Sequence, residues 1–352
     1  MTLRGPVRER AVFAAAEALV RRQCEDEAQR ALLQAALAKI GGHLQRPPPP
    51  PFYLSCVHVP LLVYAALRGE QESALPLAVA CLFVHAGLDL LDDVMDGDLP
   101  DAWRSRPAQA VLAGATLTGA LAPLALLALP APPRTVLALQ RLLAEAGLAL
   151  SAGQQGDLAA ARTAQIPPGV AVAHLAERKT GAELALYAAL AARLGGAKRG
   201  VGDRWTAFGR ALGAARQLRT DCFDLFAAEQ SRDLSAGTRT LPIALCHDAL
   251  AEAERPAFLD LLRRAQRDAA AQRTIREKLV ATGILQSSAL VVESYCQRAR
   301  DALAATGARE PAASELQAMI DDCSFFAAGS IARTEGAGGP AAGAEKTAGV
   351  QP

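Results

Sequence analysis

Residues 75–98 read LPLAVACLFVHAGLDLLDDVMDGD, in which an apolar run passes directly into a dense acidic cluster. The run is rich in alanine and leucine and its apolar residues recur at helical spacing, so we expect one continuous helix. Asp89, Asp92, Asp93 and Asp96 stand at i, i+3, i+4 and i+7, which predicts four carboxylates on one helical face. The pattern indicates an acidic face at the mouth of an apolar cavity.

Carboxylates this close repel one another, at a cost of about 0.2–0.5 kcal/mol for each i,i+4 pair even on an exposed helix. A bound cation removes that cost. Hard oxygen ligands suit Mg²⁺, which usually takes one or two carboxylates together with phosphate oxygens of a substrate. A solvated acidic helix end is the alternative interpretation, but it leaves the preceding apolar run unexplained. We therefore predict a magnesium site that binds a phosphorylated substrate.

A second acidic pair lies downstream in FGRALGAARQLRTDCFDL, residues 208–225. Asp221 and Asp224 are i,i+3 neighbours on a predicted amphipathic helix, a pattern that by itself occurs on many surface helices. Its significance lies in the pairing with the first cluster, because two acidic faces across one cavity would hold several Mg²⁺ ions. Such ions would clamp a diphosphate and stabilise it as the leaving group when a carbon–oxygen bond ionises.

The rest of the 352-residue chain is also predicted to be helical, since β-branched and aromatic residues are sparse. No linker divides the helices, so we expect a single all-α domain over residues 10–328, preceded by a flexible N-terminus over 1–9. The Gly/Ala-rich tail over 329–352 should be disordered. Helical periodicity runs through Arg10–Ile40, Pro60–Leu67, Leu75–Met95, Thr135–Ala161, Val170–Leu194, Arg204–Glu229, Leu241–Leu250, Pro256–Ala281, Leu285–Ala304 and Ala313–Phe326.

Charge and cysteine usage exclude several classes of protein. With 37 basic and 36 acidic residues, the chain has no basic excess for binding nucleic acid. Seven scattered cysteines without CxxC spacing indicate buried thiols in a reducing compartment. The charged N-terminus lacks the apolar core of a signal peptide, so we expect a cytoplasmic protein.

One uncharged stretch, Pro107 to Pro133, is long enough to cross a bilayer. Pro123 interrupts it, and no similar stretch accompanies it. Because a helix that is apolar all round can also be the central helix of a bundle, we favour that interpretation and expect no transmembrane span.

Several landmarks, in order, resemble the trans-polyprenyl diphosphate synthase family. DDVMD at 92–96 matches the family's DDxxD motif, and 208–224 resembles the helix that carries its second acidic motif. The remaining matches are GQQGDL at 153–158 for GQxxDL, KT at 179–180, and DLSAGTRTLP at 233–242 for DLxxGKxTLP. The ordered set, from about Pro60 to Leu245, is more specific than any of its members.

The resemblance implies a single-domain antiparallel helical bundle of the isoprenoid synthase type around a deep apolar cavity. It implies that Asp92 and Asp96, assisted by Asp93, hold Mg²⁺ opposite Asp221 and Asp224, with more than one ion bound. Family members are usually homodimers, so a homodimer is expected.

The resemblance also assigns the substrate contacts. Lys179 and Thr180 would contact an allylic prenyl diphosphate, with Lys179 taking part in catalysis, and Gln217 would lie near the reacting chain. Gly87, five residues before the first motif, is small, which predicts an open cavity and a product of C20 or longer.

The chain departs from the family pattern at several binding positions. Thr220 replaces the first aspartate of the second motif. Thr238 replaces the lysine of GKxTLP, for which the neighbouring Arg239 would supply the charge. The paired arginines after DDxxD correspond only loosely to Arg104 and Arg106.

The motif for the homoallylic co-substrate, GGKxxRP, is degraded. GGHLQRP at 41–47 resembles it, with Arg46 as the candidate ligand, although PLLV at 60–63 aligns better by distance and has no preceding arginine. We predict a prenyltransferase that condenses an allylic prenyl diphosphate with isopentenyl diphosphate into a longer polyprenyl diphosphate. A terpene cyclase-like enzyme on the same substrates and a weakly active regulatory subunit of a prenyl synthase remain as alternatives.

Overall fold

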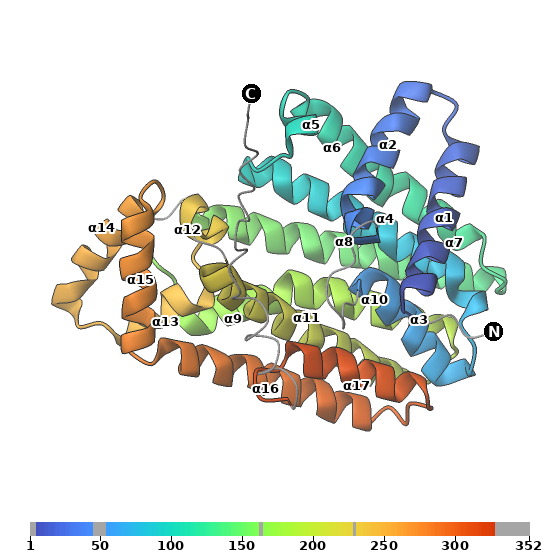
Figure 1. Ribbon diagram of the computed structural model, residues 1–352. Helices are drawn as coiled ribbons and strands as arrows, with labels where there is room; N and C mark the ends of the chain where they lie inside the picture. Colours follow the sequence, from blue (N-terminus) through green and yellow to red (C-terminus); the bar gives the residue numbers. More distant parts are fainter. Residues whose placement is uncertain (1–4, 45–53, 162–164, 228–229, 328–352) are drawn as a thin grey trace, which may run out of the picture.

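The computed structural model describes residues 5–44, 54–161, 165–227 and 230–327, and within them every regular element is helical (Figure 1). This confirms the all-α fold class. The first half comprises α1 (Gly5–Gln23), α2 (Glu27–Ile40), η1 (Gly41–Leu44), α3 (Ser55–Arg68), η2 (Glu72–Ala74), α4 (Leu75–Asp96), α5 (Asp101–Arg104), α6 (Pro107–Thr116), η3 (Leu117–Leu121), α7 (Ala122–Leu127) and α8 (Pro133–Ala161). The second half comprises α9 (Gly169–Arg178), α10 (Thr180–Leu194), α11 (Arg199–Ala227), α12 (Arg232–Ala236), α13 (Leu241–Ala249), η4 (Glu252–Glu254), α14 (Arg255–Ala265), α15 (Ala269–Ala281), α16 (Ile284–Ala304) and α17 (Ala312–Cys323).

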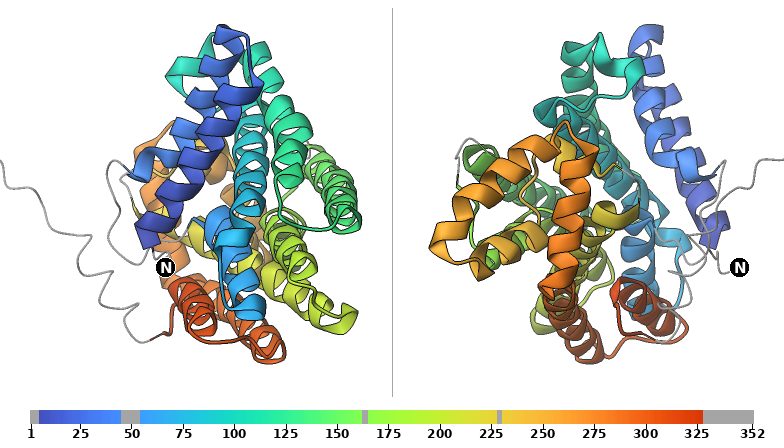
Figure 2. Two further views of the ribbon diagram at one scale, coloured as in Figure 1. Left: turned by 90° about the vertical axis from the view of Figure 1, so that its right-hand side faces the viewer. Right: turned by 60° about the vertical axis from the view of Figure 1, so that its left-hand side comes forward.

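Helix α4 is the predicted helix of the acidic stretch, and it packs against α1, α3, α6 and α7 (Figures 1 and 2). Its aliphatic and aromatic side chains, such as Leu82, Phe83 and Leu90, are buried. The helix ends at Gly97, whose φ of 70° is left-handed, and the Gly97 N–H bonds to the carbonyl of Asp93. The acidic cluster therefore occupies the last two turns of a buried helix.

Helices α10 and α11 cross at very short range. A Cβ at Gly213 would lie 2.3 Å from the carbonyl oxygen of Thr180, and one at Gly209 would lie 2.3 Å from that of Leu184. Only residues without a side chain allow this approach. The crossing holds the helix of the second acidic pair beside the start of α10, while α16 packs on α11 as well.

The predicted flexible N-terminus over residues 1–9 is wrong for residues 5–9, which belong to a helix, while residues 1–4 lie outside the described residues. Helix α1 begins at residue 5, and the Arg8 side chain is fully buried. Its guanidinium bonds to side chains that tie α1 to α3, η2 and α17, namely His58, Gln71 and Glu315. The tail over 329–352 lies outside the described residues.

The uncharged stretch from Pro107 to Pro133 is not a central helix. It forms α6, the π-helical turn η3 and α7, which pack on α4 and leave Leu112 67% and Leu127 59% exposed. The role of buried central helix falls to α4. Among the described residues, three helices are long and apolar enough to cross a membrane by length and composition alone, namely Glu72–Asp96, Pro107–Leu127 and Pro133–Gly156. The bent pair Ala269–Ala281 and Ile284–Ala304 would be a fourth if it formed one span.

Candidate active site

Two carboxylates of α4 face α2. Lys39, in the last turn of α2, donates hydrogen bonds from Nζ to Asp89 at 2.5 Å and to Asp93. The lysine is 26% exposed, so this ion pair is partly withdrawn from solvent. Sequence reasoning did not identify Lys39.

Asp92, at the other edge of the cluster, has different partners. Asp92 accepts a hydrogen bond from Gln154 Nε2 of α8 at 2.8 Å and lies 3.6 Å from Lys179 Nζ. Asp96 is exposed in the last turn of α4. Positions i to i+7 cover an arc of about 100° on a helix, so its two edges meet different neighbours. The four carboxylates therefore do not act as one set.

The start of α10 is joined to α11 by a chain of hydrogen bonds. Helix α9 ends before Lys179, which places Lys179 and Thr180 at the N-terminus of α10. The Thr180 hydroxyl donates to Gln217 Oε1 at 2.8 Å, and Gln217 Nε2 donates to Asp221 Oδ1 at 2.8 Å. Lys179 pairs with Asp92 of α4, and its charge also acts on Asp221 of α11. The acidic residues of α4 and α11 therefore lie on either side of Lys179.

Asp221 belongs to a group of three carboxyls with Asp224 and Asp233. Burial raises the pKa of Asp221 to about 7, with the charges of Asp233 and Asp224 adding to the rise and the Gln217 hydrogen bond opposing it. Burial and the charge of Asp224 raise the pKa of Asp233 to about 6. Asp224 accepts hydrogen bonds from the Ser231 hydroxyl and, at 3.0 Å, from the Asp233 backbone N–H. Asp233 was not among the predicted site residues.

The two threonine departures are both exposed. Thr220 is exposed, and its hydroxyl donates to the Arg216 carbonyl at 3.0 Å. Thr238 is exposed as well. Arg239 is half-buried and donates to the Gly237 carbonyl at 3.2 Å, and burial lowers the pKa of its guanidinium.

The remaining predicted cations lie earlier in the chain. Arg104 and Arg106 are exposed at α5 and in the turn before α6. Arg46 lies outside the described residues, so its predicted contact with a co-substrate stays a prediction.

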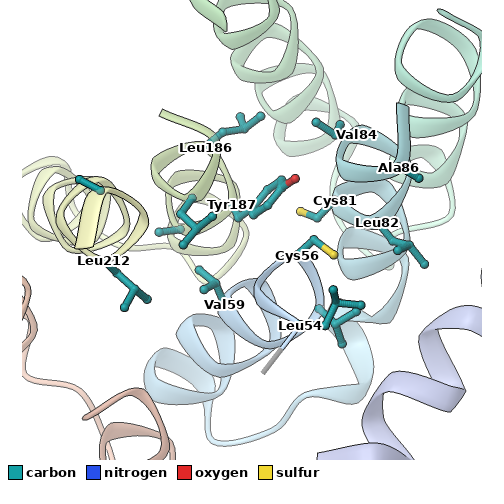
Figure 3. Packing of buried hydrophobic residues seen from close by; sticks show 14 of the residues in the cluster. Leu54, Cys56, Val59, Cys81, Leu82, Val84, Ala86, Leu186, Tyr187 and Leu212 are labelled. Atoms are coloured by element: carbon teal, nitrogen blue, oxygen red, sulfur yellow. The ribbon is translucent and has the colours of Figure 1, made fainter. Parts of the chain in front are cut away.

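An apolar cavity of about 310 Å³ lies between α4, η3, α7, α8 and α10. Its wall includes Val84 and Leu88 of α4 and Leu186 of α10, and Leu88 lies one turn from Asp92. Figure 3 shows Val84 and Leu186 on neighbouring helices, with Tyr187 between them. The acidic end of α4 therefore stands next to a pocket suited to a hydrocarbon chain.

Gly87 does not open this cavity. A Cβ at Gly87 would lie 2.6 Å from Thr118 Cγ2 and 2.8 Å from the Gly114 carbonyl oxygen. The glycine serves the close packing of α6 and η3 on α4, so the inference from Gly87 to a long product rests on a wrong premise.

A second hollow of about 510 Å³ lies between α11 and α16. It is open to solvent, and charged residues such as Asp203, Arg210 and Arg298 line it. We place the candidate site at the smaller cavity, because its wall includes Leu88, one turn before Asp92 on α4.

The acidic residues suit magnesium in their chemistry. Within the described ranges, no three or more His, Cys, Asp or Glu side chains form a ready-made metal centre. Mg²⁺ does not require one, since it usually binds one or two carboxylates and completes its shell with phosphate oxygens and water. The crowding of Asp221 with Asp224 and Asp233 is a local excess of negative charge that a cation would relieve.

Residues 57–279 match the family model described as polyprenyl synthetase, which covers well over half of the chain. The chain belongs to the polyprenyl synthetase family. Among curated members, the (2E,6E)-farnesyl diphosphate synthases of Mycobacterium bovis and Mycobacterium tuberculosis are 32% identical over 201 residues. That match covers 52% of this chain and 54% of each relative, so it spans about half the length of these polyprenyl synthetases.

Solved polyprenyl synthetase structures share the whole fold. The geranylgeranyl pyrophosphate synthetase of Pyrococcus horikoshii Ot3 superimposes with a TM-score of 0.76 at 21% identity, covering 90% of this chain and 95% of its own. The polyprenyl synthase of Caulobacter crescentus CB15, solved with calcium and isoprenyl diphosphate, gives 0.73 at 23% identity, covering 93% and 100%. At these identities the likeness establishes the isoprenoid-synthase type of helical bundle.

Proposed function

We propose that this polyprenyl synthetase is a magnesium-dependent prenyltransferase. It would ionise an allylic prenyl diphosphate and condense it with isopentenyl diphosphate into a longer polyprenyl diphosphate. The observation that carries the proposal is the pairing of Asp92 with Lys179 beside the Thr180–Gln217–Asp221 chain, one helical turn from Leu88 in the wall of an apolar cavity. A diphosphate with a hydrocarbon tail matches that combination of charge and apolar surface.

Different groups of the chain would bind the diphosphate and the hydrocarbon tail of the substrate. The N-terminus of α10 would offer its backbone N–H groups and the Lys179 ammonium to the diphosphate of the allylic substrate. The Thr180 hydroxyl, which donates to Gln217 in this structure, would turn to the diphosphate to join them. Arg239 would add charge from the α12–α13 connection. These groups hold the leaving group while the cavity aligns the tail and keeps water from the reacting carbon.

The metal sites would be formed by two pairs of carboxylates. Asp92 and Asp96 would hold Mg²⁺ from the end of α4, and Asp221 and Asp224 would hold it from α11. Bound there, magnesium supplies positive charge that stabilises the departing diphosphate. Asp93 assists by pairing with Lys39, which orients the end of α4. The polyprenyl synthase of Caulobacter crescentus CB15 was solved with calcium and isoprenyl diphosphate, which are a divalent cation and a ligand of the class proposed here.

We further propose a cytoplasmic homodimer without a transmembrane span. Leu112 of α6 and Leu148 of α8 are 67% and 76% exposed, and exposed apolar side chains of this kind are candidates for burial against a second copy. A second copy would bury these apolar side chains, so their exposure does not require a transmembrane span. A purified protein that remains monomeric by light scattering would contradict the dimer.

The decisive experiment incubates the purified protein and Mg²⁺ with C5 to C20 allylic diphosphates, with and without isopentenyl diphosphate. We expect longer diphosphates only when isopentenyl diphosphate is present. Asp92→Asn should lower the turnover number at least about 100-fold, because the group acts on the leaving group in the transition state. An Asp98→Asn variant, with an exposed carboxylate just beyond α4, is the control and should keep full activity. Full activity of Asp92→Asn would refute the metal assignment.

A further inference from the structure

Helix α15 carries a buried glutamine that is connected to the second acidic pair by hydrogen bonds. Gln272 is 2% exposed, and its side-chain amide makes three hydrogen bonds. Its Oε1 accepts from the Ser231 backbone N–H at 2.9 Å. Its Nε2 donates to Ser235 Oγ at 3.1 Å and to the Ala265 carbonyl at 2.9 Å. The glutamine therefore joins α15 to the start of α12 and to the end of α14 (Figure 1).

Ser231 continues this chain of hydrogen bonds to Asp224. The serine is buried and caps α12, because its hydroxyl oxygen accepts from the Leu234 N–H at 3.1 Å. Its hydroxyl hydrogen is donated to Asp224 Oδ2, which also accepts the Asp233 N–H at 3.0 Å. Two donors at the start of α12 therefore hold one oxygen of the Asp224 carboxylate.

The second oxygen of Asp224 is not held in this way. Oδ1 lies 3.7 Å from Nε of Arg232, which is beyond hydrogen-bond distance, and it accepts no hydrogen bond from any of the described residues. Arg232 is mostly exposed, so this ion pair is weak. The Asp224 side chain keeps 15% of its exposure. The carboxylate is thus fixed at one oxygen and available to a cation at the other.

Helix α15 also holds the backbone next to Asp224. Arg276 stands four residues after Gln272, so both side chains lie on one face of α15. The Arg276 Nε donates to the Leu225 carbonyl at 2.5 Å, in the last turn of α11. A cation is favourable at the C-terminus of a helix, where carbonyl groups lack partners. One face of α15 therefore fixes the end of α11 and, through Ser231, the side chain of Asp224.

A buried amide is not needed for packing alone. Its burial is unfavourable unless hydrogen bonds compensate, and a methionine would fill the same space without that requirement. Carboxylates that bind metals are commonly oriented by hydrogen-bonding partners behind them. Because Thr220 replaces one carboxylate of the second motif, the pair Asp221 and Asp224 has to serve without it. The orientation of Asp224 then matters more.

We propose that Gln272 is a positioning residue for magnesium, which acts through Ser231 to present Asp224 Oδ1 to the ion. This inference rests on the proposed magnesium-dependent function and extends it to α15. Gln272 itself touches neither the ion nor the substrate. Its loss should therefore lower the affinity for Mg²⁺ and leave the rate at saturating Mg²⁺ close to that of wild type, because the groups that act on the substrate are unchanged.

The test compares wild type with Gln272→Met, which keeps the length of the side chain and loses all three hydrogen bonds. Calorimetric titration with Mg²⁺ in the presence of inorganic pyrophosphate, corrected by a titration without protein, measures binding in the absence of any reaction. We expect the Kd for Mg²⁺ to rise about tenfold. In the elongation assay, the Mg²⁺ concentration for half-maximal activity should rise by the same factor, with kcat at saturating Mg²⁺ and the KM of the allylic substrate near their wild-type values.

Gln71→Met is the matched control, because Gln71 is also a buried glutamine and accepts a hydrogen bond from Arg8 Nε at 3.0 Å. It should lower the stability of the protein and leave the affinity for Mg²⁺ unchanged. An equal fall in Mg²⁺ affinity in the two variants would show that lost stability is the cause, and would overturn the proposal.

A double-mutant cycle tests the path through Ser231. Ser231→Ala removes the hydroxyl that reaches Asp224 and should by itself raise the Kd for Mg²⁺ about tenfold. Gln272→Met should then add little, because the connection is already broken. Fully additive effects would overturn this path. If Gln272→Met fails to fold, Ser231→Ala decides alone, and an unchanged affinity for Mg²⁺ in that variant would overturn the proposal.

The remaining outcomes separate this proposal from the proposed function. An unchanged affinity for Mg²⁺ in Gln272→Met, or a low kcat that saturating Mg²⁺ does not restore, would overturn the role of Gln272 alone. A wild-type protein that binds Mg²⁺ with pyrophosphate and makes no elongated product would refute the elongation reaction, while the titration would still decide the role of Gln272. A wild-type protein that binds no Mg²⁺ with pyrophosphate would refute both.

Discussion

Single side chains decide how the negative charge of α4 is balanced, and Lys39 is the clearest case. Burial alone would lower the pKa of its ammonium, but hydrogen bonds to Asp89 and Asp93 raise that pKa above its ordinary value. The charged lysine therefore fastens the end of α2 to the acidic end of α4. Asp92, which pairs with Lys179 instead, remains on the side of the apolar cavity.

Replacing Lys39 by methionine tests this balance. Asp89 and Asp93 would then repel each other without a counter-charge, so Lys39→Met should lower the Tm in the absence of magnesium by about 2 °C, for a loss of about 1 kcal/mol. Added Mg²⁺ should raise the Tm of the variant more than that of wild type, because the ion can bind at the vacated carboxylates. Thermal unfolding with and without Mg²⁺ measures both effects.

Arg141→Met is the matched control, since Arg141 pairs with Glu145 on the exposed surface of α8. It should leave both Tm values unchanged. A Lys39→Met protein with the wild-type response to magnesium would contradict the role given to the lysine.

At the level of elements, the register between α10 and α11 depends on glycine. Thr180 and Gln217 can bond only because α11 lies against the first turn of α10, where Gly213 leaves room for the Thr180 carbonyl. The break between α9 and α10 is equally necessary, since it gives Thr180 a place at a helix N-terminus.

Gly213→Ala should separate the two helices. Its Cβ would meet backbone atoms of Thr180 at 2.3 Å, which cannot move away as a flexible side chain would. We expect a loss of stability of about 1–3 kcal/mol, typical of overpacking, and a fall in kcat as the Thr180–Gln217–Asp221 chain is disturbed. Denaturant unfolding and the elongation assay provide the measurements.

Gly202→Ala on the same helix is the control, because nothing lies within 4 Å of its Cβ position. Alanine there should stabilise α11 by about 0.5–1 kcal/mol. Equal effects of the two substitutions would show that the close crossing is not what Gly213 provides.

Across the whole protein, a buried polar network joins the two ends of the described chain. Arg8 of α1 bonds to Glu315 of α17 and to His58 Nδ1 of α3, each at 3.0 Å. Arginine can only donate, so Nδ1 accepts and the Nε2–H of His58 donates to Glu9 at 2.8 Å. His58 must therefore be neutral to keep both bonds.

This network predicts a loss of stability in acid. Burial lowers the pKa of His58, the charge of Arg8 adds to the effect, and the Glu9 hydrogen bond opposes it. The unfolded chain, with a histidine pKa of about 6.5, then binds more protons than the folded protein. Stability from His58 is therefore complete above about pH 6.5 and declines as the pH falls below it.

Thermal unfolding from pH 7.5 to 5 should show this decline in wild type, and His58→Gln should have a smaller pH dependence. His174→Gln, at an exposed position of α9, serves as the control and should follow wild type. The comparison of slopes is needed because the raised pKa of Asp221 acts in the opposite direction, stabilising the folded protein at low pH. Parallel curves for wild type and His58→Gln would contradict the prediction.

Local patterns in the chain were enough to predict the helical class, a helix over residues 75–95 and the family. These three features depend on composition and on the spacing of residues along one helix, and both are properties of the local sequence. Only the position of Lys39, just before the GGHLQRP segment, gave a reason to suspect it. Asp233 and Gln154 belong to recognised motifs, but other residues of those motifs were taken as the functional ones. Nothing near Glu183 in the sequence indicated that it would meet His85.

The amino-acid sequence thus determined which residues carry charge and which helix they stand on. The tertiary structure decided their partners: Lys39 for Asp89 and Asp93, Lys179 for Asp92, and His85 for Glu183. It also decided that Gly87 serves helix packing and not the cavity. The physical reason is that helical periodicity fixes the face of its own helix on which each side chain stands. The partner that this side chain meets depends on how separate helices cross.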